Sequence, residues 1–172
     1  GPFADLWNFN GGLLEPSAMA PVFKAGKTVL TYNNDVEGYR PEMQRYCNGF
    51  YQLRAGIHGT FNWEYMGFNG NPYDDQDAPT DSWLTRYPAL PELGEVGGSS
   101  TGWAGARAGV DDYRYAQTLR EAVSRGLKSR NKEAQRAAAR GNEVLGAVLA
   151  SLDYRPFTRG TATWTSEQAG PE

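Results

Sequence analysis

Short apolar runs alternate with longer helical patterns along the first third of the chain. Residues 3–8, 28–33 and 57–63 predict three strands, and the second has the β-branched character of a strand buried on both faces. Between them, residues 17–26 and 41–56 carry apolar positions at helical spacing. This order is typical of a parallel βαβ sheet, so we expect adjacent parallel strands with helix 41–56 packed across the last two.

The pattern changes after residue 65. Residues 66–105 show little periodicity and are rich in glycine, proline and aromatic side chains. A stretch of this length without regular structure is unusual in a compact domain unless it has a function. We expect it to be ordered, with Trp83 and Tyr87 buried against a helix over residues 112–125.

The end of the chain predicts two closing helices and a tail. Asp111 or Asp112 is expected to cap the first helix, and the second spans about residues 131–152. Three strands cannot close a barrel, which needs eight. The chain therefore predicts either a small open sheet or an α/β fold that is the C-terminal part of a (β/α)8-type barrel.

The barrel interpretation divides the chain into three parts. Residues 1–65 form the last βα units, residues 66–105 form the long aromatic loop region, and residues 106–172 form the closing helices and tail.

Composition and charge argue against two kinds of partner. The chain has 172 residues and a formal net charge of −3, which argues against a broad nucleic-acid surface. Basic residues do cluster from Arg120 to Arg140, but Glu121 and Glu133 interrupt them, which is typical of a solvated helix face. No apolar run approaches the roughly 20 residues that span a bilayer, so we expect no membrane partner.

The single cysteine and the single histidine limit the possible chemistry. Cys47 lies in a helical apolar pattern and is expected to be a buried free thiol, and His58 at the entry of its strand is expected to be structural. The acidic residues Asp74, Asp75 and Asp77 do not have the spacing of an EF-hand. With no phosphate-binding loop either, the sequence predicts neither a metal nor a cofactor.

Aromatic, amide and carboxylate side chains follow the ends of the predicted strands. Loops at the carboxyl ends of parallel strands build the ligand sites of such sheets. Aromatic rings match the apolar faces of sugars, and amides match their hydroxyl groups. We therefore expect a carbohydrate-binding cleft lined by Trp7, Asn8, Tyr32, Asn33, Asn34, Trp63 and Tyr65. The structural alternative is core packing for Trp7 and Trp63, and turn formation for Asn33 and Asn34.

Glu64 is the expected catalytic residue. A carboxylate directly after a tryptophan at a strand end is costly unless it is paired or used. Glycosidases of the usual kind need two carboxylates. Within this chain, only Asp35 or Glu37 is placed to supply the second one.

The segment from residue 55 onward resembles a known family. Its most specific part is Ala-Arg-Ala-Gly-Val-Asp-Asp-Tyr-Arg-Tyr, residues 106–115. This string is similar to the R-x-G-I-D-D-Y-x-Y-L signature that closes the catalytic barrel of bacterial glycoside-hydrolase-like proteins. These proteins are similar to the β-N-acetylgalactosaminidases of glycoside hydrolase family one hundred and twenty-three. The resemblance covers roughly residues 55–120.

The resemblance implies a secreted protein, extracellular or periplasmic, with a (β/α) barrel that hydrolyses N-acetylhexosamine-type glycosides with help from the substrate's own acetamido group. In that family, the catalytic Asp-Glu pair lies on an earlier strand, and no adjacent Asp-Glu pair stands at a strand end here. We therefore expect part of a glycoside hydrolase of polysaccharide degradation, whose acid pair lies on a missing part or on another chain that completes the barrel. The alternative is a non-catalytic carbohydrate-binding or structural subunit of a larger assembly.

Overall fold

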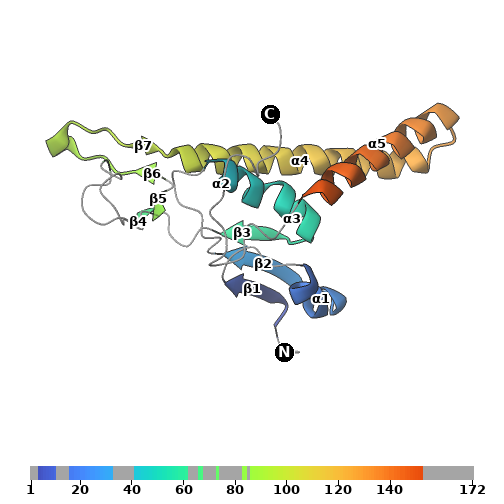
Figure 1. Cartoon of the computed structure of the whole chain (residues 1–172), viewed down its shortest axis with the longest axis horizontal. Helices are drawn as coiled ribbons and strands as arrows, with labels where there is room; N and C mark the ends of the chain where they lie inside the picture. Colours follow the sequence, from blue (N-terminus) through green and yellow to red (C-terminus); the bar gives the residue numbers. More distant parts are fainter. Residues whose placement is uncertain are drawn as a thin grey trace.

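Three parallel strands form the main sheet of the protein (Figure 1). The computed structural model describes residues 4–10, 16–32, 41–61, 66–67, 73, 83–84 and 86–152. Strands β1 (Leu6–Asn10), β2 (Thr28–Tyr32) and β3 (Gly59–Phe61) lie in the order β1-β2-β3. Both neighbouring pairs are parallel, which confirms the predicted βαβ arrangement. β1 begins at residue 6, later than the predicted strand 3–8.

The helices between the strands cover one face of this sheet. They are α1 (Pro16–Lys24), α2 (Pro41–Asn48) and α3 (Phe50–Ala55). On that face, the His58 ring packs against Phe23 of α1, while the Thr60 hydroxyl donates a 2.8 Å hydrogen bond to Asn48 of α2. One buried core also contains residues from all three helices and from β2. α1, α2 and α3 therefore pack on the same face.

The main hydrophobic core fills the space between this face and the helices. Met19 of α1, Val29 of β2, Cys47 of α2 and Tyr51 of α3 are fully buried there. The predicted single helix over residues 41–56 is divided into α2 and α3 at Gly49. The core therefore joins elements from the first 57 residues into one unit.

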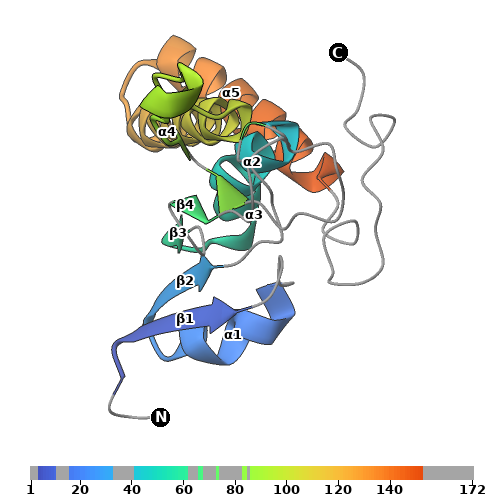
Figure 2. The same cartoon turned by 90° about the vertical axis from the view of Figure 1, so that its left-hand side faces the viewer.

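The other face of the sheet has no helix against it among the described residues (Figure 2). By strand alternation this face carries Leu6 and Asn8 of β1, Leu30 of β2 and Phe61 of β3, which the parallel register places side by side. Leu6 is 55% exposed and Phe61 is 53% exposed. Parallel sheets are almost always covered on both faces. Among the described residues, helices therefore cover one face of this sheet, while the other face exposes the apolar side chains of Leu6 and Phe61.

The region predicted as one long loop contains two short antiparallel ladders. β4 (Met66–Gly67) pairs with β5 (Trp83–Leu84), and β6 (Arg86–Tyr87) pairs with β7 (Gly98–Ser99). A 3₁₀ helix, η1 (Pro91–Leu93), lies between β6 and β7.

Tyr87 packs within this region and not on the closing helix. Its ring stacks on Tyr73 with 5.2 Å between the centroids, and the Tyr73 hydroxyl donates a 2.6 Å hydrogen bond to the Pro88 carbonyl. In Figure 1, β6 lies beyond the amino-terminal end of the closing helix, so the predicted packing of Tyr87 on residues 112–125 is wrong. The side chain of Trp83 lies outside the described residues.

Two long helices form the closing hairpin: α4 (Thr101–Leu127) and α5 (Lys132–Ser151). The Ser100 hydroxyl caps α4 by accepting a 3.0 Å hydrogen bond from the Trp103 N–H. The prediction that Asp111 or Asp112 caps this helix is therefore wrong, because both residues lie more than two turns inside it.

Helices α2 and α4 cross at close range through glycines. A Cβ atom at Gly109 would lie 3.0 Å from the Cα of Arg45, and one at Gly105 would lie 2.6 Å from the Cα of Pro41. In both cases the carbonyl oxygen of the α2 residue is nearer still. Gly105 and Gly109 are four residues apart in α4, and Pro41 and Arg45 are four residues apart in α2. One i, i+4 row of residues therefore packs directly on another. Any side chain at either glycine would force the two backbones apart.

We predict that Gly109→Ala and Gly146→Ala change stability in opposite directions. Gly109→Ala should lower the free energy of unfolding by about 3 kcal/mol, because the methyl group overpacks a backbone contact. Gly146→Ala is the matched control: it also lies inside a helix, and a Cβ there meets nothing within 4 Å. The control should raise stability by about 0.5–1 kcal/mol through helix propensity. Urea unfolding measures both, and equal stabilities would disprove the close crossing.

Candidate functional site

The carboxyl ends of the three strands meet at one edge of the sheet. Asn10 at the end of β1 is in register with Tyr32 at the end of β2, and Tyr32 is in register with Phe61 at the end of β3. In parallel sheets, this edge is the place where ligands bind. It is therefore the candidate site of the protein.

The predicted site residues are only partly described. Tyr32 lies at this edge and is half-buried. The others predicted to follow the strand ends lie outside the described residues: Asn33, Asn34, Trp63, Glu64 and Tyr65. The same is true of Asp35 and Glu37, the predicted second carboxylates.

Trp7 and Asn8 lie inside β1 and not past its end, which corrects their predicted position. Trp7 is on the helix-covered face, half-buried, where its ring stacks with Phe9 at 6.5 Å. Its indole N–H donates a 3.3 Å hydrogen bond to the Ala4 carbonyl. Asn8 is exposed on the opposite face. The structure therefore does not bring these two side chains together.

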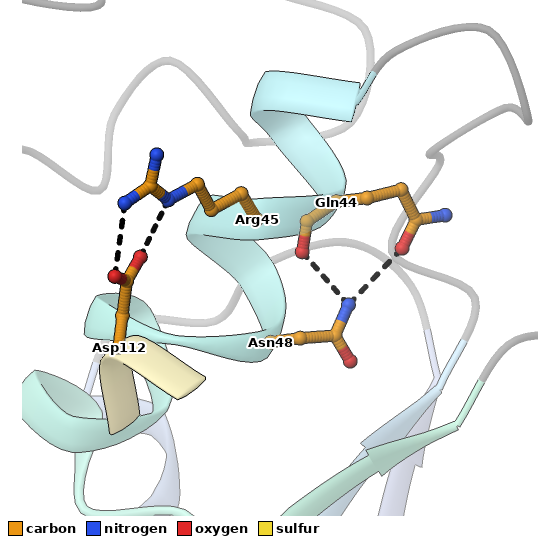
Figure 3. Close-up of polar contacts among 4 residues, drawn as sticks. All are labelled: Gln44, Arg45, Asn48 and Asp112. Atoms are coloured by element: carbon orange, nitrogen blue, oxygen red, sulfur yellow. Dashed lines mark hydrogen bonds and ion pairs between the residues drawn. The ribbon is translucent and has the colours of Figure 1, made fainter. Parts of the chain in front are cut away.

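A row of amides on α2 and α3 meets the sheet near the same edge, and the sequence did not predict it. The Asn48 amide donates hydrogen bonds to the carbonyl oxygen and the Oε1 atom of Gln44, at 2.8 and 3.0 Å (Figure 3). Asn48 Oδ1 accepts from the Thr60 hydroxyl at 2.8 Å, and that hydroxyl accepts from Gln52 at 3.4 Å. Gln44 and Gln52 are only 4% and 9% exposed. Spacing of four residues places these amides on one helix face, which was the available sequence signal.

The amide row can orient, but it cannot transfer protons. Its groups are neutral amides and a hydroxyl, which do not titrate near neutral pH. Next to Thr60 in the register, the Thr31 hydroxyl is fully buried and has no hydrogen-bond partner among the described residues. An unsatisfied buried hydroxyl costs about 1–3 kcal/mol. We assign this network a structural role: it fixes α2 and α3 against β3 beside the candidate site.

Cys47 and His58 have the structural roles that were predicted. Cys47 is fully buried, and its burial raises the pKa of the thiol well above the usual range. The Nδ1 atom of His58 accepts a 3.1 Å hydrogen bond from the Val29 N–H, while the His58 N–H donates to the Val29 carbonyl at 2.8 Å. The imidazole thus continues the ladder between β2 and β3 at the amino-terminal end of the strands. In the described part of the chain, no group of three histidine, cysteine or acidic side chains is placed to hold a metal ion.

Residues 106–115, which lie within α4, contact α2. The Asp112 carboxylate binds Arg45 through two atoms, with Nε–Oδ2 at 2.6 Å and Nη2–Oδ1 at 2.9 Å (Figure 3). The hydrogen bond and the charge of Asp112 raise the pKa of Arg45 above its usual value. Asp111 faces solvent and lies 3.8 Å from Arg114 on the same helix. In the described structure, Asp112 therefore joins helices and does not face the carboxyl edge of the strands.

In comparisons with known proteins, no family model and no curated protein matches the sequence. The described structure is a mixed α/β arrangement with a three-stranded parallel sheet. Among its described helices, none is both long and apolar enough to cross a membrane.

We predict that Cys47 does not react with iodoacetamide in the folded protein. Only the thiolate is nucleophilic, and the raised pKa leaves almost no thiolate between pH 7 and 9. Alkylation should follow the unfolding rate and become fast in urea, which mass spectrometry can measure. Fast labelling in buffer that leaves the fold intact would show that the thiol is accessible.

We predict that Asp112→Asn lowers stability more than Asp111→Asn does. The first change breaks a two-atom ion pair, but Arg45 is 58% exposed, so solvent screening limits the loss to about 1 kcal/mol. The second change removes only an exposed contact within α4 and should have little effect. Thermal unfolding at low and high salt measures both. A loss that is equal for both variants would contradict a specific role for Asp112.

Proposed function

We propose that the chain is a sector of a carbohydrate-active (β/α) barrel and part of a glycoside hydrolase. The observation that carries this proposal is the one-sided covering of the parallel sheet. In a (β/α) barrel, helices cover the outer face of the strands, and apolar side chains on the inner face pack together inside the barrel. Leu6, Leu30 and Phe61 occupy that inner position on a face that is exposed here.

The proposed reaction is hydrolysis of N-acetylhexosamine-type glycosides in a glycan or polysaccharide. The substrate class rests on the resemblance of residues 106–115 to the barrel-closing signature. We place the reaction at the carboxyl edge of β1–β3, beside Tyr32, with Glu64 as a catalytic carboxylate and Trp63 and Tyr65 as sugar-stacking rings. A second carboxylate comes from another part of the protein or from a partner chain that completes the barrel.

A second candidate is a non-catalytic carbohydrate-binding or structural subunit. It is supported by the role of Asp112, because the most specific acidic residue of the signature binds Arg45. A chain that keeps the architectural residues of a barrel and has lost its reaction would retain this ion pair.

We predict that Glu64→Gln lowers the hydrolysis of aryl N-acetylhexosaminides by roughly 10²–10⁴-fold, the usual contribution of general acid–base catalysis. The assay should use the native protein with any chain that copurifies with it. Glu42→Gln is the control, since it changes an exposed carboxylate on α2, and it should keep full activity.

Three outcomes separate the interpretations. Full activity in Glu64→Gln would show that Glu64 is not catalytic. Glycan binding without hydrolysis in the native protein, with all its partners, would favour the non-catalytic subunit. Unfolding of Trp63→Ala would place that ring in the core and not in the cleft.

A further inference from the structure

The end of the α4–α5 hairpin is strongly basic. We call residues 120–140 the basic tip: it carries seven basic and two acidic side chains, a net of +5 in a chain whose total is −3. All seven basic residues are exposed: Arg120, Arg125, Lys128, Arg130, Lys132, Arg136 and Arg140. Figure 1 shows the tip at the end of the long axis opposite to β6 and β7. The rest of the chain is therefore acidic, and the charge is divided between two regions.

Like charges lie next to one another in the basic tip, which lowers the stability of its helix. Lys132, Arg136 and Arg140 follow one another at intervals of four residues on α5, so neighbouring like charges lie on one face. Such pairs destabilise a helix, whereas a solvated helix usually alternates the sign of charge. Within the tip, the ion pair that the described structure shows is Arg125 with Glu121, 3.7 Å apart and more than 70% exposed. A bound anion would relieve this repulsion.

The side chains of the tip suit an anionic polymer but offer little for reading nucleic-acid bases. Residues 120–140 contain no aromatic ring on which a base can stack. The two amides that could read base edges are engaged, because Asn131 caps α5 and Gln135 donates a 2.8 Å hydrogen bond to the Ser129 carbonyl. Five arginines remain, and their planar guanidinium groups bind carboxylates through two atoms, as they also bind phosphates.

The end of the tip lies beyond the packed part of the hairpin. Leu119 is the last residue of α4 that packs on the cluster with Leu53 of α3. From there to Leu127 the helix rises about 12 Å. This is longer than the screening length of about 8 Å at physiological salt, so the charges at the far end of the tip are largely screened from the packed part of the hairpin. The end of the tip projects along the long axis, where a single polymer chain can reach it (Figure 1).

We propose that the basic tip binds an acidic polysaccharide through its uronate carboxylates. The proposal rests on the proposed function, and it adds a substrate class: a polymer in which uronate alternates with N-acetylhexosamine. The strands run away from the tip in Figure 1, so the tip lies far from their carboxyl ends. It therefore acts as an anchoring site that keeps the polymer near the protein, and it takes no part in bond cleavage.

The test measures the affinity of the full chain for hyaluronan, with carboxyl-reduced hyaluronan as the uncharged control. The tip variant carries Arg130→Glu, Lys132→Glu and Arg136→Glu. The control variant carries Lys24→Glu, Arg86→Glu and Arg107→Glu, which are exposed positions outside the tip with the same change in charge. The tip variant should bind at least roughly tenfold more weakly, the control less than about threefold, and binding should fall steeply with salt. Circular dichroism verifies that both variants fold.

Several results would overturn the proposal. These are no binding of hyaluronan, equal binding of the carboxyl-reduced polymer, or equal losses in the two variants. Equal or tighter binding of duplex DNA or of phosphatidylserine vesicles to the tip would assign it to another partner. The Glu64→Gln variant separates this test from that of the proposed function, because it should lose hydrolysis and keep hyaluronan binding. Binding at the tip without any hydrolysis in the native protein would contradict the proposed function alone.

Discussion

The close crossing of α2 and α4 is the contact on which the rest of the structure depends. Gly105 and Gly109 allow the α4 backbone to lie against Pro41 and Arg45 of α2, at a distance that no other residue type permits. α2 belongs to the core that includes α1 and β2, and α4 packs against α5. The crossing therefore joins the sheet to the helical hairpin. Asp112, one turn beyond Gly109, then fixes the crossing with its ion pair to Arg45.

This crossing gives a physical reason for the glycine and the second aspartate in residues 106–115. The glycine is needed for backbone contact, and the second aspartate is needed for the ion pair between helices. Both roles are architectural. The proposed chemistry is placed elsewhere, at the carboxyl edge of the sheet, and the proposed anchoring of the polymer is placed at the basic tip. The helix crossing and the two proposed sites thus use separate parts of the chain.

The strand order was predictable because it depends on local signals. The β-branched run at residues 28–32 and the helical spacing after Pro41 are visible in the sequence alone. The break at Gly49 was not predictable, because its cause is a contact with Gly109, 60 positions later in the chain. The start of α4 was placed about ten residues too late for a related reason. Gly102, Gly105 and Gly109 reduce intrinsic helix propensity, and packing on α2 overrides that loss.

The candidate site was less predictable than the fold. The predicted strand 3–8 ends two residues before β1 does, which placed Trp7 at the strand end, although its ring packs on the helix-covered face. The buried amides Gln44 and Gln52 look like ordinary surface residues in sequence, because their burial depends on their partners Asn48 and Thr60. Burial and partner identity are properties of the tertiary structure, and periodicity alone does not supply them.

Native-state hydrogen exchange tests the central role of the crossing most directly. If α2 and α4 hold the structure together, the amides of residues 43–48 and 105–112 should exchange only through global unfolding, with the same free energy as those of β2. The amides of the basic tip should open locally, at a lower free energy. Two results would contradict the central role of the crossing. One is that residues 43–48 open independently of residues 105–112, and the other is that the basic tip is as protected as the crossing.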